Sequence, residues 1–171
     1  MKDVFLVYDK SCFYEIIILN YYLSFSKCDV VLCSLDGGPV RTMEGYSVNV
    51  DMALKDVDPA QVRSFVLPGG GIAAVDREEV WACLRELRRR DVLIAGICAG
   101  VDVLDHAGVL EGRRSTHSTD LDIVNDRHVI TARANAYVDF AIEAAKELGL
   151  FSSEAELEET IGFWKHYHRM Q

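Results

Sequence analysis

The stretch from Val92 to Asp105 constrains the fold most strongly, because an apolar run passes directly into a helical pattern at Cys98. Its sequence is VLIAGICAGVDVLD, with small residues on both sides of the cysteine. Small residues allow the sharp strand-to-helix turn in which a side chain stands clear of the end of a sheet. The following helix directs its free N–H groups at the sulfur, which favours the thiolate. We therefore interpret Cys98 as a nucleophile or an oxidation sensor, against the alternative of a buried core cysteine.

Apolar runs and amphipathic stretches alternate along the rest of the chain. The predicted strands span residues 3–8, 29–34, 64–68, 92–97 and 127–132, with a hairpin over 40–43 and 46–50. The predicted helices span residues 12–26, 78–90 and 136–148, where apolar residues recur at helical spacing. This alternation is typical of an α/β sandwich around a mostly parallel sheet. Functional sites in such folds lie at the carboxyl ends of the strands.

A last helix is predicted to begin after Ser153, which forms a possible capping box with Glu156. Its apolar stripe of Leu157, Ile161 and Trp164 covers either the chain's own core or a second subunit. A length of 171 residues fits one domain with a full core. We therefore expect a single domain over residues 1–171, in which 151–171 form an extra C-terminal helix.

Composition and charge exclude several function classes. The formal net charge of −9 argues against nonspecific binding to nucleic acid or to an anionic membrane. The one dense basic run, Arg88 to Arg90, falls at a predicted helix end, where cations complement the helix dipole. The longest apolar run, Ile16 to Leu19, is too short to span a bilayer. We expect neither a nucleic-acid partner nor a membrane partner.

The five cysteines show no CxxC spacing and are odd in number, so that neither a zinc site nor a disulfide framework is expected. Free thiols in a chain whose start, at Met1, carries no export signal predict a cytoplasmic location. No metal and no organic cofactor is implied.

Four segments share the pattern of a known family. Residues 95–100 (AGICAG) match a nucleophile elbow, and residues 66–71 (VLPGGG) match a glycine loop. Glu15 stands where a buried acid is kept, and residues 108–117 (GVLEGRRSTH) match the segment after the elbow helix. Over roughly residues 2–150 the chain resembles the ThiJ/PfpI (DJ-one) superfamily, a branch of the class I glutamine amidotransferase-like folds. The resemblance implies an α/β flavodoxin-like three-layer sandwich with a mostly parallel central sheet.

The resemblance also implies a catalytic set of Cys98, Glu15 and His117. Glu15 would be protonated and would donate a hydrogen bond to the thiolate, because a buried carboxyl beside a negative sulfur stays neutral. His117 would be a second proton carrier, although a lone histidine in a loop is as often a hydrogen-bonding residue. Glu15 alone, without the family pattern, would be interpreted as a solvated helix residue.

Backbone N–H groups of Gly70, Gly71 and Ala99 are predicted to form an oxyanion or substrate-binding pocket near the sulfur. The alternative is that the glycines only form a turn. Arg133, which follows the last predicted strand, is a further candidate for substrate binding.

Two departures from the family pattern bear on function. The residue after the nucleophile is Ala99, where protease-like branches have a histidine, so no adjacent imidazole can take a proton. Peptide hydrolysis is therefore not expected. Asp102 adds a carboxylate to the first turn of the elbow helix, where it would oppose a thiolate if it faced the sulfur.

Three functions remain open at this point. The first is a thiol-dependent enzyme of the lyase or hydrolase kind, acting on a small electrophile such as a reactive carbonyl, as a deglycase does. The second is a redox-sensing or stress-response protein in which Cys98 is oxidised without turnover. The third is a scaffold with a vestigial elbow. The expected partners are a small-molecule substrate or oxidant and a second copy of the chain in a homodimer.

Overall fold

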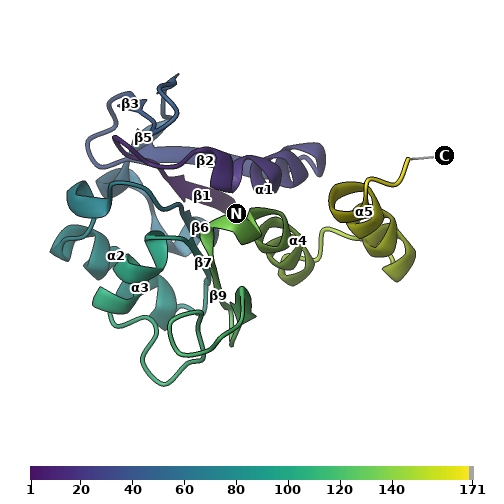
Figure 1. The fold of residues 1–171 in the computed structure, drawn as a ribbon. Helices are drawn as coiled ribbons and strands as arrows, with labels where there is room; N and C mark the ends of the chain where they lie inside the picture. Colours follow the sequence, from purple (N-terminus) through teal and green to yellow (C-terminus); the bar gives the residue numbers. More distant parts are fainter. Residues whose placement is uncertain (170–171) are drawn as a thin grey trace.

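A seven-stranded sheet forms the centre of the molecule, and helices cover both of its faces (Figure 1). In this computed structural model, which describes residues 1–169, the strand order is β5-β2-β1-β6-β7-β9-β8. Neighbouring strands are parallel except at one edge, where β8 runs antiparallel to β9. The strands of this sheet are β1 (Lys2–Leu6), β2 (Asp29–Ser34), β5 (Met52–Ala53), β6 (Val62–Leu67), β7 (Leu93–Ile97), β8 (Ile123–Asn125) and β9 (Val129–Ala132).

The helices and a small hairpin complete the fold. The helices are α1 (Tyr14–Phe25), α2 (Glu78–Arg89), α3 (Gly100–His106), α4 (Tyr137–Glu147) and α5 (Glu154–His166). The hairpin pairs β3 (Val40–Arg41) with β4 (Ser47–Val48). Helices α2 and α3 cover one face of the sheet and α1 and α4 cover the other, with α5 outside them (Figure 1). The molecule is therefore the three-layer α/β sandwich that the sequence predicts.

Alternating side chains of the buried strands supply two cores. Along β1, Val4 and Leu6 belong to the core beneath α2 and α3, whereas Phe5 belongs to the core beneath α1 and α4. Successive side chains of a strand point to opposite faces, which explains this division. Helices cover both faces, and the central strand β7 accordingly carries only apolar residues and glycine, all five of them buried.

The predicted strands and helices are present, and the bounds of several differ by one or two residues. Helix α1 begins two residues later than predicted, because Cys12 donates its backbone N–H to the Gly69 carbonyl at 2.9 Å and Ser11 bridges Gly70. The predicted hairpin is shorter than expected. The short edge strands β5 and β8 were not predicted, since neither contains an apolar run long enough to stand out.

The last helix packs on its own domain. Leu157 is buried and belongs to the same apolar cluster as residues of α1 and α4, and the half-buried Ile161 and Trp164 pack against that cluster. The Ser153 hydroxyl accepts the N–H of Glu156 at 3.2 Å, as expected for an N-cap. The Glu156 carboxylate instead accepts the N–H of Ser152 at 2.7 Å, so the second half of the capping box is displaced by one residue.

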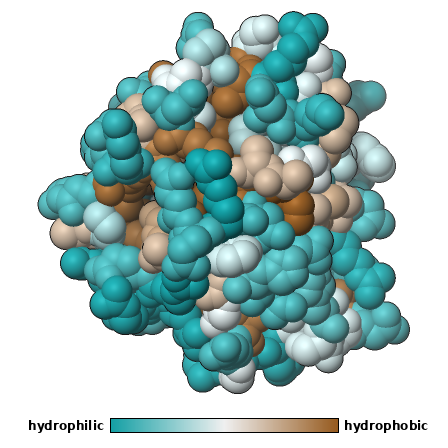
Figure 2. All heavy atoms as spheres, turned by 90° about the vertical axis from the view of Figure 1, so that its left-hand side faces the viewer, coloured by the Kyte–Doolittle hydropathy of each residue, from teal (hydrophilic) through white to brown (hydrophobic). Residues whose placement is uncertain are grey.

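The side of the molecule that carries α2 presents mostly hydrophilic residues (Figure 2). There the arginines at the end of α2 are paired, Arg89 and Arg90 with Glu86 and Arg88 with the Gly108 carbonyl. This agrees with the interpretation of the basic run as a solvated helix end. Among residues 1–169, no helix combines the length and the apolar character needed to cross a membrane.

Candidate active site

The nucleophile elbow is a strained turn between β7 and α3. Cys98 has a backbone φ of 55°, a left-handed conformation that costs a residue with a side chain about 1–2 kcal/mol. Its N–H donates to the Ala132 carbonyl of β9 at 2.9 Å, and its carbonyl accepts the N–H of Val101 at 3.1 Å. These bonds hold the turn between strand and helix. The half-buried sulfur therefore lies at the carboxyl end of β7, as the sequence predicts.

The glycine loop after β6 lies directly against this elbow. A β carbon on Gly69 would lie 2.6 Å from the Cys98 β carbon and 2.9 Å from its Sγ. On the other side of the contact, a β carbon on Gly100 would lie 2.4 Å from the Leu67 carbonyl oxygen. Side chains essentially never approach so closely, so both positions require glycine. The glycine loop and the elbow therefore pack backbone against backbone at these two positions.

Glu15 reaches this contact from the first turn of α1. Its side chain is 1% exposed, and its Oε2 accepts the backbone N–H of Gly69 at 2.7 Å. The hydroxyl of Tyr14 lies 3.5 Å from the other carboxyl oxygen. The structure therefore places Glu15 inside the molecule, as the family resemblance implies, and excludes the interpretation as a solvated helix residue.

Glu15 and Cys98 affect each other's ionisation. Burial raises the pKa of Glu15, while hydrogen bonds from Gly69 and from the Cys98 side chain oppose that rise. Burial also raises the pKa of Cys98, and the negative charge of Glu15 raises it further, whereas the N–H groups of Ala99 and Gly70 lower it. Two adjacent negative charges in a buried place are unfavourable. We therefore expect the two groups to hold one proton between them and to titrate as a pair.

His117, the third residue of the predicted catalytic set, has partners other than Cys98 and Glu15. The ring nitrogens of His117 lie 3.3 Å from Asp102 and 3.7 Å from Asp105, both on α3. Among the described residues, no hydrogen bond or ion pair joins His117 to the cysteine or to Glu15. The Asp102 carboxylate is thus paired with an imidazole.

Within residues 1–169, no group of three or more side chains is placed to hold a metal ion.

Two predicted binding residues have other partners. The N–H of Gly71 donates to the Lys10 carbonyl at 2.9 Å, so it is not free to bind an oxyanion. The side chain of Arg133 lies 3.2 Å from Asp120 and 3.6 Å from Asp122. Of the three predicted N–H donors, those of Gly70 and Ala99 lower the pKa of the Cys98 thiol.

Two residues of the site were missed in the sequence. The hydroxyl of Tyr8 donates to the carbonyls of Pro68 and Gly69, at 2.8 and 2.9 Å, and so positions the glycine loop. Burial, followed by the charges of Glu15 and Cys98, raises the pKa of Cys12 to about 11. Both residues lie in the segment between β1 and α1, at the same carboxyl ends of the parallel strands as the rest of the site. Because sites in such sheets lie at those ends, this position could have identified them from the sequence.

Comparison with known proteins decides the family. Residues 1–147 match the model of the DJ-1/PfpI family. The chain belongs to the DJ-1/PfpI family. The match covers the elbow, the glycine loop and Glu15, and ends at the last residue of α4. Helix α5 lies beyond it.

Four relatives are named as deglycases, and two of them show how far the likeness extends. The deglycase PfpI of Pyrococcus furiosus is 31% identical over 140 residues, which are 76% of this chain and 84% of that protein. A deglycase of Thermococcus kodakarensis is 35% identical over 95 residues, which are 54% of this chain and 57% of that protein. The chain thus spans little more than half the length of the Thermococcus relative.

A solved structure extends the likeness to the whole DJ-1/PfpI fold. A DJ-1 superfamily protein of Agrobacterium tumefaciens superposes with a TM-score of 0.87 at 28% sequence identity. The superposition covers 98% of this chain and 100% of that one. The α/β sandwich described above is therefore the fold of this family.

Proposed function

We propose that this protein is a cysteine-dependent enzyme with deglycase-like activity, acting on a small reactive carbonyl compound. The observation that carries the proposal is the pairing of Cys98 at the elbow with the buried Glu15, across Gly69. The deglycase names of four relatives support this class of substrate. A small hydrolytic reaction would use the same pair with a different substrate.

The proposed first step is addition of the sulfur to the carbonyl group. In the attacking form, Cys98 is the thiolate and Glu15 holds the shared proton. An S–C bond forms, the π electrons of the carbonyl group move to its oxygen, and Glu15 gives that oxygen its proton. The products are a neutral hemithioacetal and the Glu15 carboxylate, so that charge and protons balance. The N–H groups of Gly70 and Ala99 stabilise the thiolate before the attack.

Peptide hydrolysis does not form part of the proposal. Ala99 offers no imidazole beside the nucleophile, and His117 is engaged by Asp102 and Asp105. No imidazole is thus placed to take the proton of the Cys98 thiol and pass it to a leaving amine, as the histidine of a Cys–His pair does.

The proposal is tested by following methylglyoxal consumption over many turnovers per protein molecule, which separates catalysis from simple thiol trapping. Cys98→Ser is expected to abolish turnover, and Glu15→Gln is expected to lower it by about 10²–10⁴, the usual contribution of a general acid. Cys83→Ser, a change in a cysteine of α2, is the matched control and keeps activity. Turnover retained by Cys98→Ser would overturn the proposal.

A redox-sensing role is the second candidate, favoured by the N–H groups of Ala99 and Gly70, which oppose the rise of the Cys98 pKa and have no counterpart among the described residues at Cys33 and Cys83. Burial raises the pKa of Cys33 to about 12 and that of Cys83 to about 11, so both stay protonated near neutral pH. Peroxide converts a thiolate to a sulfenic acid with release of water or hydroxide. Limiting peroxide followed by peptide mapping is expected to find oxygen on Cys98 first. Equal oxidation of all five thiols would exclude this role.

The homodimer stays a prediction of the resemblance. Sedimentation of the purified protein over a range of concentrations tests it, and a monomer throughout that range would contradict it.

A further inference from the structure

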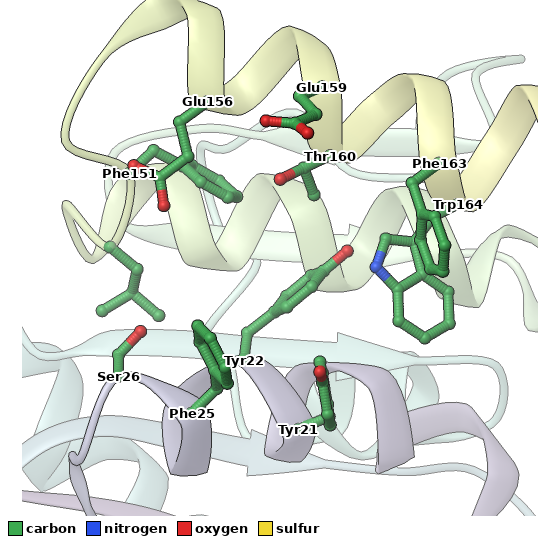
Figure 3. Close-up of a pocket in the computed structure, with 11 residues that line it drawn as sticks. Tyr21, Tyr22, Phe25, Ser26, Phe151, Glu156, Glu159, Thr160, Phe163 and Trp164 are labelled. Carbon is green, nitrogen blue, oxygen red and sulfur yellow. The ribbon is translucent and has the colours of Figure 1, made fainter. Parts of the chain in front are cut away.

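Helix α1, which carries Glu15 in its first turn, is held in different ways at its two ends. Toward its C-terminal end, aromatic rings pack on α5 and on the segment before it (Figure 3). The ring centroid of Tyr22 lies 6.0 Å from that of Trp164 and 6.2 Å from that of Phe151. At the other end the N-cap residue is Phe13, whose side chain has no hydrogen-bond acceptor. The first turn therefore depends on a cap from another part of the chain.

Glu44, in the turn between β3 and β4, supplies this cap. Its Oε1 accepts the backbone N–H of Tyr14, the first residue of α1, at 2.9 Å. A carboxylate in this place satisfies a free N–H of the helix and lies at the positive end of the helix dipole. Because Glu44 stands 30 residues away from Tyr14 along the chain, no local capping motif shows this contact in the sequence.

Backbone hydrogen bonds hold the hairpin of β3 and β4 against the segment between β1 and α1. The N–H of Met43 donates to the Ser11 carbonyl at 2.9 Å, and the N–H of Lys10 donates to the Arg41 carbonyl at 2.7 Å. The turn that carries Glu44 is therefore tied by main-chain bonds to the segment from which α1 begins.

Glu44 is ionised at neutral pH. Loss of part of its hydration raises its pKa, but hydrogen bonds from backbone N–H groups, that of Tyr14 first, bring the pKa below its ordinary value. Burial acts most strongly on the pKa of Glu15, the next residue of α1, and the charge of Glu44 raises that pKa further. The leading influences on the pKa of Cys98 are burial, the Glu15 charge and the Ala99 N–H. The charge of Glu44 therefore acts mainly on Glu15.

Titratable groups from other parts of the site also face Glu15: Cys98, Tyr8, Cys12 and Tyr14. Burial, followed by the charge of Glu15, raises the pKa of Cys12 to about 11 and that of Tyr14 to about 12, and it also raises the pKa of Tyr8. These three groups therefore keep their protons at neutral pH. Among the described groups that act on Glu15, Glu44 is thus the one that brings a fixed charge.

We propose that Glu44 is a positioning residue of the active site, which fixes the first turn of α1 and keeps the proton of the Cys98–Glu15 pair on Glu15. A negative charge beside Glu15 disfavours a carboxylate there more than it disfavours a thiolate at Cys98. The proton therefore stays on the carboxyl group, and the sulfur is left as the attacking thiolate. Glu44 acts through Glu15, so this inference rests on the pairing in the proposed function.

The alkylation rate of Cys98 against pH tests the proposal in the natural protein and in Glu44→Gln. The glutamine amide oxygen still accepts the Tyr14 N–H, so this change removes the charge and keeps the cap. Between the two titration steps of the pair, the rate is expected to fall about two- to fivefold, which corresponds to the usual strength of exposed charge pairs. At about 1 M salt this difference is expected to shrink, because salt screens an exposed charge.

Above the second titration step, Cys98 is a thiolate in every molecule, so the natural protein and Glu44→Gln are expected to react at equal rates. Glu156→Gln is the matched control, since Glu156 is also an exposed carboxylate that accepts a backbone N–H at the start of a helix, that of Ser152 at 2.7 Å. It is expected to leave the alkylation profile unchanged.

Glu44→Ala separates the cap from the charge, because it removes both. It is expected to lower the urea midpoint as well as the alkylation rate, whereas Glu44→Gln should keep the midpoint of the natural protein. A cap with a structural role alone would lower the midpoint of Glu44→Ala and leave the alkylation profile of Glu44→Gln unchanged.

Three results would overturn the proposal. Equal rates for the natural protein and Glu44→Gln between the two steps would overturn this inference alone, because the two steps themselves would support the pairing. A fall of the same size above the second step would also overturn it, since a charge that only moves the proton cannot slow a fully ionised thiol. A single step in the natural protein would overturn the pairing and this inference together.

Discussion

Gly69 is the residue through which the glycine loop, Glu15 and the nucleophile meet. Its N–H binds the Glu15 carboxylate, and its α carbon faces the Cys98 side chain with no room for a methyl group. A chain can bring its catalytic groups this close only where one position lacks a side chain. The reactivity of the sulfur therefore depends on a residue that has no reactive group of its own.

Gly69→Ala is expected to destabilise the protein by about 1–3 kcal/mol, the usual cost of overpacking, and to slow alkylation of Cys98. The added methyl group would have to displace the cysteine side chain and the Ala99 N–H, which lies 2.8 Å from its position. Urea denaturation and alkylation kinetics measure the two effects. Gly112→Ala is the control, because that site has φ of 68° but open space, so it loses stability without a change in alkylation.

The burial of Glu15 predicts a pH-dependent stability. Glutamate in an unfolded chain titrates near about 4.3, and burial raises the pKa of Glu15 in the folded protein. Between the two pKa values the folded state binds more protons than the unfolded state. The free energy of unfolding therefore falls as the pH rises through that window.

Glu15→Gln removes this titration, so this site no longer makes stability fall as the pH rises. The free energy of unfolding of the variant minus that of the natural protein is therefore expected to be larger at pH 8 than at pH 4. Urea denaturation of both proteins at the two pH values measures the difference. Stability differences that are the same at pH 4 and pH 8 would show that the buried carboxyl does not titrate differently in the folded state.

At the scale of elements, apolar pattern and small residues carried most of the information. Strands such as β2, buried on both faces, and amphipathic helices such as α2 were predictable because each has one period and one environment. The three-residue edge strand β8 and the loop before it were not, since their positions depend on contacts with β9 and not on local pattern. The two possible roles of the Leu157 stripe also needed the structure, because periodicity does not say what a helix covers.

Leu157→Ala is expected to lower the free energy of unfolding by about 2–3 kcal/mol, because it removes a buried side chain of α5 that belongs to the same apolar cluster as residues of α1 and α4. The loss should be the same at all protein concentrations if α5 packs on its own domain. Glu158→Ala, at the exposed neighbouring position, is expected to cost less than about 0.5 kcal/mol. A cost for Leu157→Ala that appears only where the protein dimerises would contradict this packing.

At the scale of the whole molecule, the sheet determines which residues form the site. The carboxyl ends of β1, β6 and β7 meet at one edge, and this topology brings Cys98 to Gly69 and Tyr8. The elbow and the glycine loop were therefore predictable from a strand pattern. His117 was not, because its side chain position is determined by a loop and by the carboxylates of α3.

The central claim is that Cys98 and Glu15 share one proton, and the most direct measurement is the alkylation rate of Cys98 against pH. Peptide mapping resolves this thiol from the other four in the natural protein and in Glu15→Gln. If the two groups share a proton, the alkylation rate of the natural protein rises with pH in two steps, the first below the ordinary thiol pKa of about 8.5. In the variant the rate rises in a single step. One identical step near that value in both proteins would contradict the claim.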